Sequence, residues 1–269
     1  MGPTGLYECK IVNKRYLSKD QFVFDLESME IAEECRPGQF VNVLCDSLLR
    51  RPVSICGVDR KRGIFQIAIR IKGSGTIFLE KKQIGESLSV LGPLGNGFDL
   101  SGVTSLVAVG GGIGIYPLLF LLREAKSLGM KTTTVCGFRS KEDSFCIDEI
   151  TAFSDHMVFA SDCGDMEVCG TAIDALQKVD LTNTTVFACG PVPMMREAGR
   201  IAFERGVECQ VSLEERMGCG TGICLVCACK IKAEESRNGN ESSANGYEYK
   251  RCCKDGPGFN AKEVAWESI

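Results

Sequence analysis

The sequence predicts a multi-domain protein that joins an antiparallel β domain, a parallel-sheet α/β domain and a small cysteine-rich domain. Its texture changes twice along the chain. Residues 7–99 hold short, alternating β-branched runs, and residues 103–211 alternate strand and helix patterns. From Glu214 onward the chain is dense in cysteine and poor in long apolar runs. A length of 269 residues suffices for two domains and a small third one.

The N-terminal zone carries five runs with the alternation expected of strands. Turn residues separate them at short, fairly even intervals, which is typical of an antiparallel barrel or sandwich. The runs are Tyr7–Val12, Gln21–Leu26, Gln39–Leu44, Gly63–Ile71 and Ser87–Leu91.

The middle zone predicts a parallel sheet covered by helices. Buried-strand runs alternate in it with apolar-periodic segments of helical length. The expected strands are Ser105–Val109, Lys131–Cys136, Val186–Ala188 and Glu208–Val211, and the expected helices are Ile115–Leu128 and Val192–Arg205.

Composition excludes several classes of function. The net charge of −4, without a block of like charges, argues against a nucleic-acid or anionic-membrane surface. No secretory signal is visible, and the most apolar stretch, Val103–Leu122, is interrupted by glycines and a proline, so no membrane span is expected. The cytoplasm is the expected compartment, where thiols stay reduced. Sixteen cysteines against a single histidine, His156, favour metal–thiolate chemistry over histidine-based catalysis.

The strongest motif is Cys219-x4-Cys224-x2-Cys227, with two more cysteines, Cys252 and Cys253, further along. This is the plant-type spacing of [2Fe-2S] ligands, whose fourth thiolate comes from a distant segment. Glycines around the first ligand permit tight bends, so that backbone N–H groups can point at sulfur. A zinc site is the alternative, although zinc sites usually pair two CxxC hairpins or add histidine. The residues alone leave the fourth ligand open between the two adjacent cysteines.

A glycine-rich loop, Gly110–Pro117, follows an expected strand and opens an expected helix. Gly111, Gly112 and Gly114 would let the backbone approach a diphosphate at the positive end of that helix. The loop departs from G-x-G-x-x-G, and no acidic ribose ligand follows at the usual distance. Glycines that serve only packing are the alternative reading.

Two further segments suit a ligand. Cys189, Gly190 and Pro191 close a strand and open a helix, where α/β sheets place ligands, although this segment taken alone favours a buried structural cysteine. In the β-rich zone, Arg51-Pro52-Val53-Ser54 and Ile69-Arg70 precede a turn with Gly75 and Thr76, a combination that suits an anionic phosphate. Read by themselves, these β-zone segments are a basic turn and a loop.

Together, in this order, the motifs resemble the ferredoxin–NADP reductase superfamily. The C-terminal run from Ser212 to Cys224, SLEERMGCGTGIC, and the run CKDGPGF from Cys253 resemble, more narrowly, the electron-transfer subunits of NAD-dependent (type B) dihydroorotate dehydrogenases. The resemblance covers residues 7–264. It implies a Greek-key FAD-binding β-barrel over 1–99, an NAD-binding α/β domain over 100–212 and a [2Fe-2S] domain over 213–269, with a mobile insertion near 234–246.

The resemblance also implies roles for individual residues. Cys189 would lie beside the nicotinamide, and Cys253, directly before the K-D-G-P turn, would be the fourth cluster ligand. The implied cluster ligands are Cys219, Cys224, Cys227 and Cys253. The implied FAD contacts are Arg51, Pro52, Val53, Ser54, Ala68, Ile69, Arg70, Gly75 and Thr76.

The implied activity is a relay in pyrimidine (UMP) biosynthesis. Electrons would pass from an FMN-containing dihydroorotate dehydrogenase catalytic subunit through the cluster and FAD to NAD+, in a heterotetramer with two copies of each subunit. Related small subunits serve NAD(P)H:ferredoxin transhydrogenases, sulfide dehydrogenases and hydrogenases, and Arg139-Ser140 leaves NADP open as the nucleotide. A zinc-binding module on an inactive reductase scaffold is the non-enzymatic alternative. His156 and Arg123 are expected on solvated surfaces.

Overall fold

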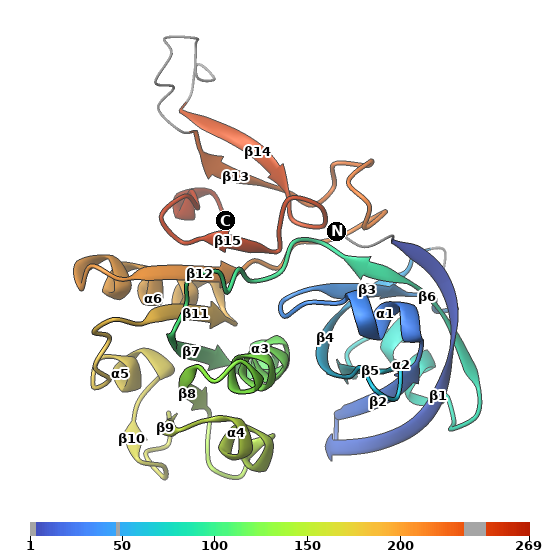
Figure 1. Cartoon of the computed structure of the whole chain (residues 1–269), viewed down its shortest axis with the longest axis horizontal. Coiled ribbons are helices and arrows are strands. Elements are labelled where there is room, and N and C mark those ends of the chain that lie inside the picture. Colours follow the sequence, from blue (N-terminus) through green and yellow to red (C-terminus); the bar gives the residue numbers. More distant parts are fainter. Residues whose placement is uncertain (1–3, 47–48, 234–245) are drawn as a thin grey trace.

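Figure 1 shows the computed structural model of the chain, which describes residues 4–46, 49–233 and 246–269. The insertion expected near 234–246 lies outside the described residues, except for Gly246. The described chain forms a barrel, an α/β layer beside it, and a C-terminal part that contacts both (Figure 1).

The N-terminal part is a closed antiparallel barrel with the strand order β1-β2-β5-β4-β3-β6, which confirms the expected Greek-key barrel. Alternate side chains point inward, and the barrel core includes Phe22, Phe24, Ile55 and Phe65, all fully buried. Its strands are β1 (Gly5–Ser18), β2 (Gln21–Glu27), β3 (Phe40–Val43), β4 (Arg51–Asp59), β5 (Ile64–Arg70) and β6 (Ser87–Leu94), with helices α1 (Met29–Glu34) and α2 (Ser74–Glu80) between them.

One barrel element differs from the turn that its residues suggest. Arg51–Ser54, expected as a basic turn, begins strand β4, which pairs with β3 on one side and β5 on the other. Two adjacent arginines and a proline resemble turn chemistry locally. Pairing with two neighbouring strands, together with the buried Ile55 and Cys56, overrides that local signal.

The middle part is a sheet of seven strands in the order β10-β9-β8-β7-β11-β12-β15, and its first six strands are parallel. Between residues 139 and 184 the sequence predicted only a strand after the Asp155–Met157 turn, which corresponds to β9, whereas α4, β10 and α5 were not predicted. The strands are β7 (Ser105–Gly111), β8 (Lys131–Phe138), β9 (His156–Ser161), β10 (Val168–Cys169), β11 (Thr185–Cys189) and β12 (Glu208–Ser212). The helices are η1 (Gly112–Gly114), α3 (Ile115–Ser127), α4 (Ile147–Phe153), α5 (Ala172–Leu176) and α6 (Val192–Glu204).

The C-terminal part does not stand apart from the sheet. Strand β15 (Gly258–Asn260) pairs antiparallel with β12 and so extends the sheet of the middle part by one strand. Strands β13 (Ala228–Lys232) and β14 (Tyr247–Arg251) form a separate hairpin, and the chain ends in η2 (Trp266–Ser268). Trp266 packs against the buried core that the sheet and the C-terminal part share, and its Nε1 donates to the carbonyl of Ala261 at 3.0 Å.

Helix α3 contributes much of the contact between barrel and sheet, and an ion pair of Arg15 on β1 with Glu149 on α4 adds to it. Tyr116 of α3 is buried and donates to the Gln21 side chain of β2. Arg123, expected on a solvated face, instead reaches the barrel, where its Nη1 donates to Gln66 Oε1 at 3.2 Å. Phe153 of α4 lies against the same guanidinium, 4.9 Å from ring centroid to Cζ. The helix periodicity gave no indication that a second domain covers this position.

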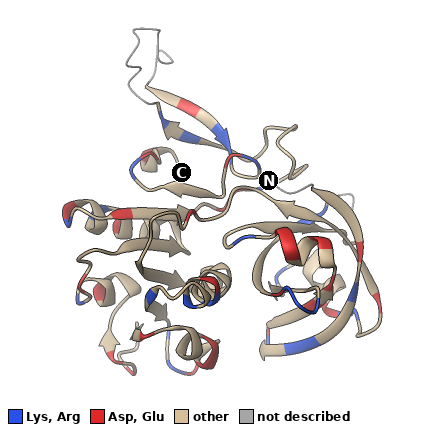
Figure 2. Ribbon diagram, in the orientation of Figure 1, with Lys and Arg blue, Asp and Glu red and all other residues tan. Residues whose placement is uncertain are grey.

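Charge and hydropathy are distributed as the composition predicts. Positive and negative residues are interspersed along the ribbon (Figure 2). His156 is exposed at the start of β9. Among the described helices, none is long and apolar enough to span a membrane.

Candidate functional site

The sheet reverses its strand order between β7 and β11. Two turns predicted from the sequence meet there, the glycine-rich loop after β7 and the turn Cys189–Pro191 after β11. Cys189 at the end of β11 pairs directly with Gly110 on β7. Strand order runs outward from β7 through β8 and β9 on one side, and from β11 to β12 on the other. In open α/β sheets ligands bind outside the carboxyl ends of the strands at this switch point.

The glycines of this site divide into two kinds. A side chain at Gly114 would collide with the carbonyl of Cys189, and one at Gly111 would lie 2.8 Å from the sulfur of Met194. Gly190 has φ +150° and faces the carbonyl of Gly111. Gly114 and Gly190 are required for the two turns to pack together because backbone atoms occupy the space of a side chain, whereas Gly111 faces the more adaptable side chain of Met194. Gly112 differs, because it is exposed, has φ +54° and has open space where a side chain would be.

Cys189 is a buried neutral thiol. Only 8% of it is exposed, and it packs with Phe98 and Phe187 on the same face of the sheet. Burial raises the pKa of this thiol to about 12. Such a thiol cannot act as a base near neutral pH, but it can pack against a flat apolar ring.

Arg51 and Gly75 lie together at the mouth of the barrel. A side chain at Gly75 would come within 2.7 Å of Arg51 Nε and 3.4 Å of the Cys45 sulfur. Within the described ranges, no carboxylate forms an ion pair with the Arg51 guanidinium, and this residue is half-buried. A half-buried, unpaired guanidinium next to a side-chain-free backbone fits an anionic diphosphate.

The other predicted flavin contacts are less uniform. Arg70 is exposed and forms an ion pair with Asp20, Nε to Oδ2 at 2.8 Å. Thr76 Oγ1 accepts from the Lys72 and Gly73 amides at 2.8 and 3.1 Å, so it closes the first turn of α2. Pro52 is exposed on β4, Val53 and Ser54 are half-buried there, and Ala68 and Ile69 are buried on β5.

The loop of residues 219–227, which we call the cluster loop, directs backbone N–H groups at one sulfur. The amides of Thr221, Ile223 and Cys224 lie 3.3, 3.3 and 3.5 Å from Cys219 Sγ, and the amide of Cys219 lies 3.3 Å from Cys224 Sγ. Burial opposes ionisation of the Cys219 thiol, but hydrogen bonds from Thr221 and the neighbouring backbone outweigh it and lower its pKa to about 5. A loop that stabilises thiolate in this way is chemically suited to a metal cluster.

The two adjacent cysteines face different surroundings. The amide of Cys253 donates to Cys227 Sγ at 3.4 Å, which places this residue beside the loop. Cys252 is fully buried on the other side, and its sulfur donates to the carbonyl of Leu213 at 3.0 Å. Among the described residues, no three His, Cys, Asp or Glu side chains gather closely enough to hold one metal ion.

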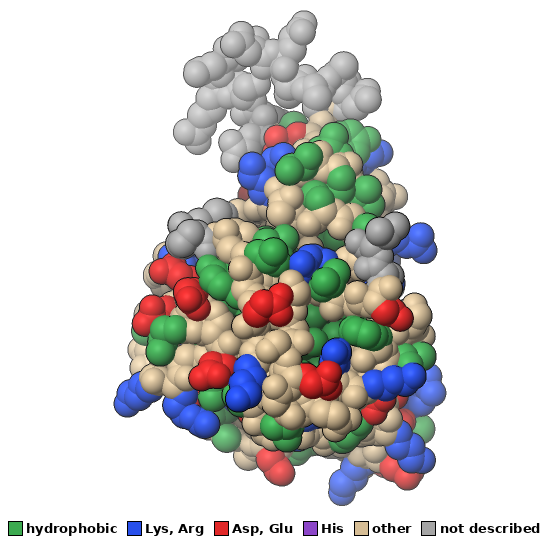
Figure 3. All heavy atoms as spheres, turned by 90° about the vertical axis from the view of Figure 1, so that its right-hand side faces the viewer, with side chains coloured by type: hydrophobic (Ala, Val, Ile, Leu, Met, Phe, Trp, Pro, Cys, Tyr) green, Lys and Arg blue, Asp and Glu red, His purple; other side chains and the backbone are tan. Residues whose placement is uncertain are grey.

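An apolar rim beside the loop was not predicted from the sequence. Ile223, Leu225 and Val226 are 83%, 62% and 58% exposed, and Cys224 between them is exposed as well. Leu225 has φ +61°, a left-handed conformation that is uncommon for a leucine. Hydrophobic side chains gather on the C-terminal part of the face shown in Figure 3. Isolated apolar residues between cluster ligands gave no sign in the sequence that they would form one surface.

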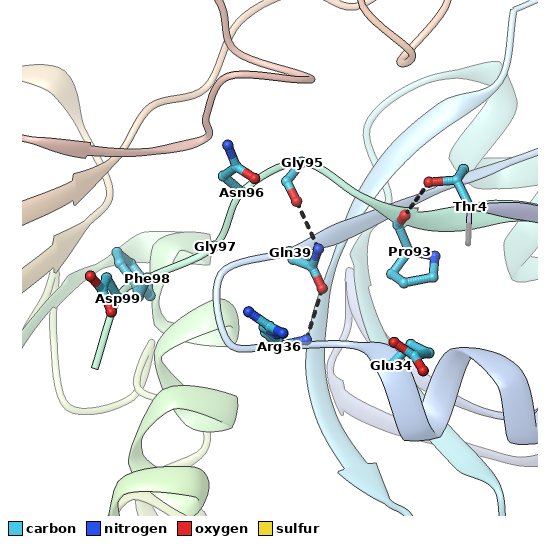
Figure 4. A pocket seen from close by; sticks show the side chains of 10 residues that line it. All are labelled: Thr4, Glu34, Arg36, Gln39, Pro93, Gly95, Asn96, Gly97, Phe98 and Asp99. Atoms are coloured by element: carbon cyan, nitrogen blue, oxygen red, sulfur yellow. Dashed lines mark hydrogen bonds between the residues drawn. The ribbon is translucent and has the colours of Figure 1, made fainter. Parts of the chain in front are cut away.

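A pocket of about 200 Å³ lies where the barrel passes into the α/β layer, between the end of α1 and the Pro93–Asp99 connection (Figure 4). Gln39 spans it, since its Nε2 donates to the carbonyl of Gly95 at 2.7 Å and its Oε1 accepts from the Arg36 amide at 2.8 Å. None of the residues predicted to bind a cofactor lines this pocket.

Comparisons with known proteins agree with these features. Residues 214–265 match the family described as iron-sulfur cluster binding domain of dihydroorotate dehydrogenase B, and residues 8–98 match the oxidoreductase FAD-binding domain. The electron transfer subunit of dihydroorotate dehydrogenase B (NAD(+)) from Bacillus caldolyticus is 38% identical over 94% of this chain and 96% of its own. The corresponding subunit from Desulforamulus reducens is 36% identical over 97% of this chain and 99% of its own.

Solved structures give the same fold. An NADH-dependent reduced ferredoxin–NADP oxidoreductase superposes with a TM-score of 0.80 at 31% identity, covering 99% of this chain and 92% of that one. The ferredoxin reductase of carbazole 1,9a-dioxygenase superposes with a TM-score of 0.66 at 21% identity, over 76% of this chain and 67% of that one, and supports the fold alone.

Fold and site together define a flavin and iron–sulfur oxidoreductase subunit of the ferredoxin–NADP reductase type. Within that class, the chain belongs to the family of electron transfer subunits of dihydroorotate dehydrogenase B. Its cofactors are therefore FAD and a [2Fe-2S] cluster, with NAD+ as the nucleotide in the family's name. This assignment replaces the zinc-module alternative.

Proposed function

We propose that this chain relays electrons between NAD+ and an FMN-containing dihydroorotate dehydrogenase catalytic subunit, as one step of pyrimidine (UMP) biosynthesis. The observation that carries the proposal is the contact among the three predicted sites. The cluster loop touches barrel strand β3, where Asn42 Nδ2 donates to the carbonyl of Cys219 at 3.3 Å, and the barrel in turn packs on α3 beside the switch point. A relay needs its redox groups in adjoining parts of one rigid body.

The chain's own residues hold and insulate these groups. When bound, FAD exchanges hydride with the nicotinamide and single electrons with the cluster, so the protein need supply no acid or base. Cys219, Cys224, Cys227 and Cys253 would ligate the cluster. We assign the fourth ligand to Cys253 because the sulfur of Cys252 is already engaged with Leu213.

The flavin and nucleotide positions follow from the same reasoning. Arg51 would neutralise the flavin diphosphate, with Gly75 admitting it, while Pro52–Ser54, Ala68–Arg70 and Thr76 shape the rest of that site. Gly112 is the glycine with open space for a nicotinamide dinucleotide. Gly111, Gly114, Gly190 and Pro191 would set the shape of the nucleotide turn, and Cys189 would pack beside the nicotinamide ring.

The catalytic subunit would dock on the exposed rim of Ile223, Leu225 and Val226. This rim surrounds Cys224, so docking there would bring the partner close to the cluster and cover apolar surface. The complex is proposed as a heterotetramer with two copies of each subunit, in the cytoplasm, where cluster thiols stay reduced. The proposed domains are 1–99, 100–212 and 213–269.

The alternative partner is a ferredoxin-linked enzyme, since one similar structure is an NADH-dependent reduced ferredoxin–NADP oxidoreductase. The dihydroorotate dehydrogenase relatives are more similar in sequence, at 38% against 31% identity, and favour the first assignment.

The decisive experiment uses anaerobically purified chain, with and without the FMN-containing catalytic subunit. The proposal expects flavin and acid-labile sulfide in the isolated chain, flavin bleaching by NADH faster than by NADPH, and dihydroorotate-dependent NAD+ reduction only when both subunits are present. A chain that contains flavin and sulfide but couples to reduced ferredoxin, and not to dihydroorotate, would transfer the assignment to the alternative.

A matched pair of arginines tests the flavin site within the same preparation. Arg51→Met should weaken FAD retention by about 1.5–3 kcal/mol, the range of a hydrogen bond to a charged group. Arg70→Met should cost under about 1 kcal/mol, because Arg70 is exposed and paired with Asp20. Equal losses for both variants, measured by FAD titration of the deflavinated protein, would show that the guanidinium at Arg51 has no special role.

A further inference from the structure

Strand β3 carries one polar side chain in a wholly buried run. Phe40, Val41 and Val43 are at most 4% exposed, and Asn42 between them is 1% exposed. Its main chain pairs with Pro52 of the predicted flavin segment on β4, and its carbonyl accepts from Arg50 Nη1 at 3.3 Å. Asn42 therefore lies at the centre of the barrel wall that faces the cluster loop.

The amide of Asn42 reaches out of the barrel to that loop. Its Nδ2 donates to the carbonyl of Cys219 at 3.3 Å, across 177 positions of sequence. The next residue, Gly220, has φ +75°, and any side chain there would collide with Asn42 Nδ2. A Gly220 side chain would also lie 3.5 Å from Leu94 Cδ1 of β6. The loop thus contacts the barrel through one amide and one apolar side chain.

Packing alone does not explain an amide at this position. Among the described residues nothing donates to Asn42 Oδ1, and a buried amide oxygen without a partner costs stability. A leucine, which has the same branching and the same number of side-chain heavy atoms, would avoid that cost. The reverse orientation of the amide would set its oxygen against the carbonyl of Cys219, so only the nitrogen can face the loop. In the part of the chain that the structure describes, the one hydrogen bond of this side-chain amide is the one to the cluster loop.

We propose that Asn42 is a positioning residue that fixes the cluster loop against the flavin barrel. The proposal rests on the proposed function. By fixing the Cys219 carbonyl, Asn42 holds the peptide planes that follow it, which direct the Thr221, Ile223 and Cys224 amides at Cys219 Sγ. Hydrogen bonds to ligand sulfur raise the reduction potential of an iron–sulfur cluster. Asn42 therefore acts on the cluster from the flavin side, without contacting it.

Asn42→Leu removes the donor while keeping the branching of the side chain. In the cluster-free chain, amide hydrogen exchange over residues 217–227 should become about three- to tenfold faster, the effect of losing one hydrogen bond. In the loaded chain, the cluster potential should shift to more negative values and its EPR spectrum should change, while the flavin potential stays as in the unmodified protein. The matched control is Leu94→Ala, which loosens packing at the same contact without removing a hydrogen bond.

The outcomes separate the two proposals. Wild-type protein without iron and sulfide would overturn the proposed function, whereas the exchange measurement on the cluster-free chain still decides the role of Asn42. Unchanged exchange and potential in Asn42→Leu, or equal shifts in Leu94→Ala, would overturn the positioning role.

If Asn42→Leu fails to fold, a double-mutant cycle gives the answer. Gly220→Ala should speed loop exchange because its new methyl group meets the amide, and Asn42→Ala combined with it should relieve part of that effect. Strictly additive effects of the two substitutions would count against a direct coupling between Asn42 and the loop.

Discussion

Cys219 in the cluster loop and Cys189 at the end of β11 both lie in glycine-rich turns, yet their sulfur atoms meet opposite surroundings. Three backbone amides point at Cys219 Sγ, and the pKa of that thiol falls to about 5. Cys189 is enclosed by apolar side chains of the sheet, and burial raises its thiol pKa to about 12. Cysteine thus serves in one turn as a thiolate suited to binding metal and in the other as a neutral thiol suited to packing.

The two turns also need glycine for different reasons. Gly220 and Gly222 have φ +75° and +86°, so they supply the bends that turn amides toward sulfur. Gly114 has an ordinary helical φ of −62°, and it is glycine because another backbone occupies the space of its side chain. At the cluster loop, glycine bends the backbone so that its amides face sulfur. At the switch point, glycine lets the turn after β7 lie directly against the end of β11. The following predictions test this contrast.

The largest effect is expected at the fourth cluster ligand. Cys253→Ala should abolish cluster assembly, with iron and acid-labile sulfide near zero, because the remaining thiolates leave one iron incompletely ligated. Cys252→Ser should retain the cluster, since a hydroxyl can still donate to Leu213. Iron and sulfide analysis of both variants gives the result, and the opposite pattern would move the ligand to Cys252.

Thiol reactivity measures the electrostatic contrast directly. In chain freed of iron by a chelator, iodoacetamide at pH 7 should modify Cys219 on the order of 100-fold faster than Cys189, because only the first is thiolate. The Cys219 rate should fall as pH drops through about 5, where the thiolate is protonated. Peptide mass spectrometry over time measures the modification rate of both cysteines. Comparable rates would mean that the two thiols do not differ in thiolate content.

A smaller effect separates the two kinds of glycine. Gly114→Ala should lower the free energy of unfolding by about 1–3 kcal/mol, because its methyl group meets the Cys189 carbonyl. Gly112→Asn should change stability by under about 0.5 kcal/mol, since asparagine tolerates φ +54° and the space is open. Urea unfolding measures both.

The same Gly112→Asn variant should bind NADH more weakly despite its stability. Unchanged NADH affinity would remove Gly112 from the nucleotide site.

The smallest effect is expected at Cys189. Cys189→Ala should slow flavin reduction by NADH by well under the roughly 100-fold that a general acid or base contributes. With its pKa raised to about 12, the thiol stays neutral, so the wild-type rate should show no inflection near pH 9, where an ordinary thiol ionises. Stopped-flow rates from pH 6 to 10 test this. An inflection that disappears in Cys189→Ala would mean that the thiol ionises during the reaction.

Local sequence patterns were sufficient to predict the fold class, the family and the cofactors. Periodicity predicted most barrel strands and the first strands and helices of the sheet, because alternation and helical spacing are local properties. The spacing of Cys219, Cys224 and Cys227 predicted the cluster for the same reason, since one short loop supplies three ligands. The roles of individual flavin and nucleotide residues remain predictions.

The tertiary structure decided what depends on contacts between distant segments. Arg51–Ser54 is a strand because it pairs with β3, and the rest of β4 pairs with β5. Strand β15, which starts at Gly258, completes a sheet whose first strand in the chain, β7, starts at Ser105. Cys252 and Cys253 are indistinguishable by spacing, but the turn that follows β14 directs the Cys252 sulfur to the carbonyl of Leu213 and sets Cys253 beside Cys227 of the cluster loop. Asn42 carries no motif, and only the closure of the barrel against that loop gives its amide a partner.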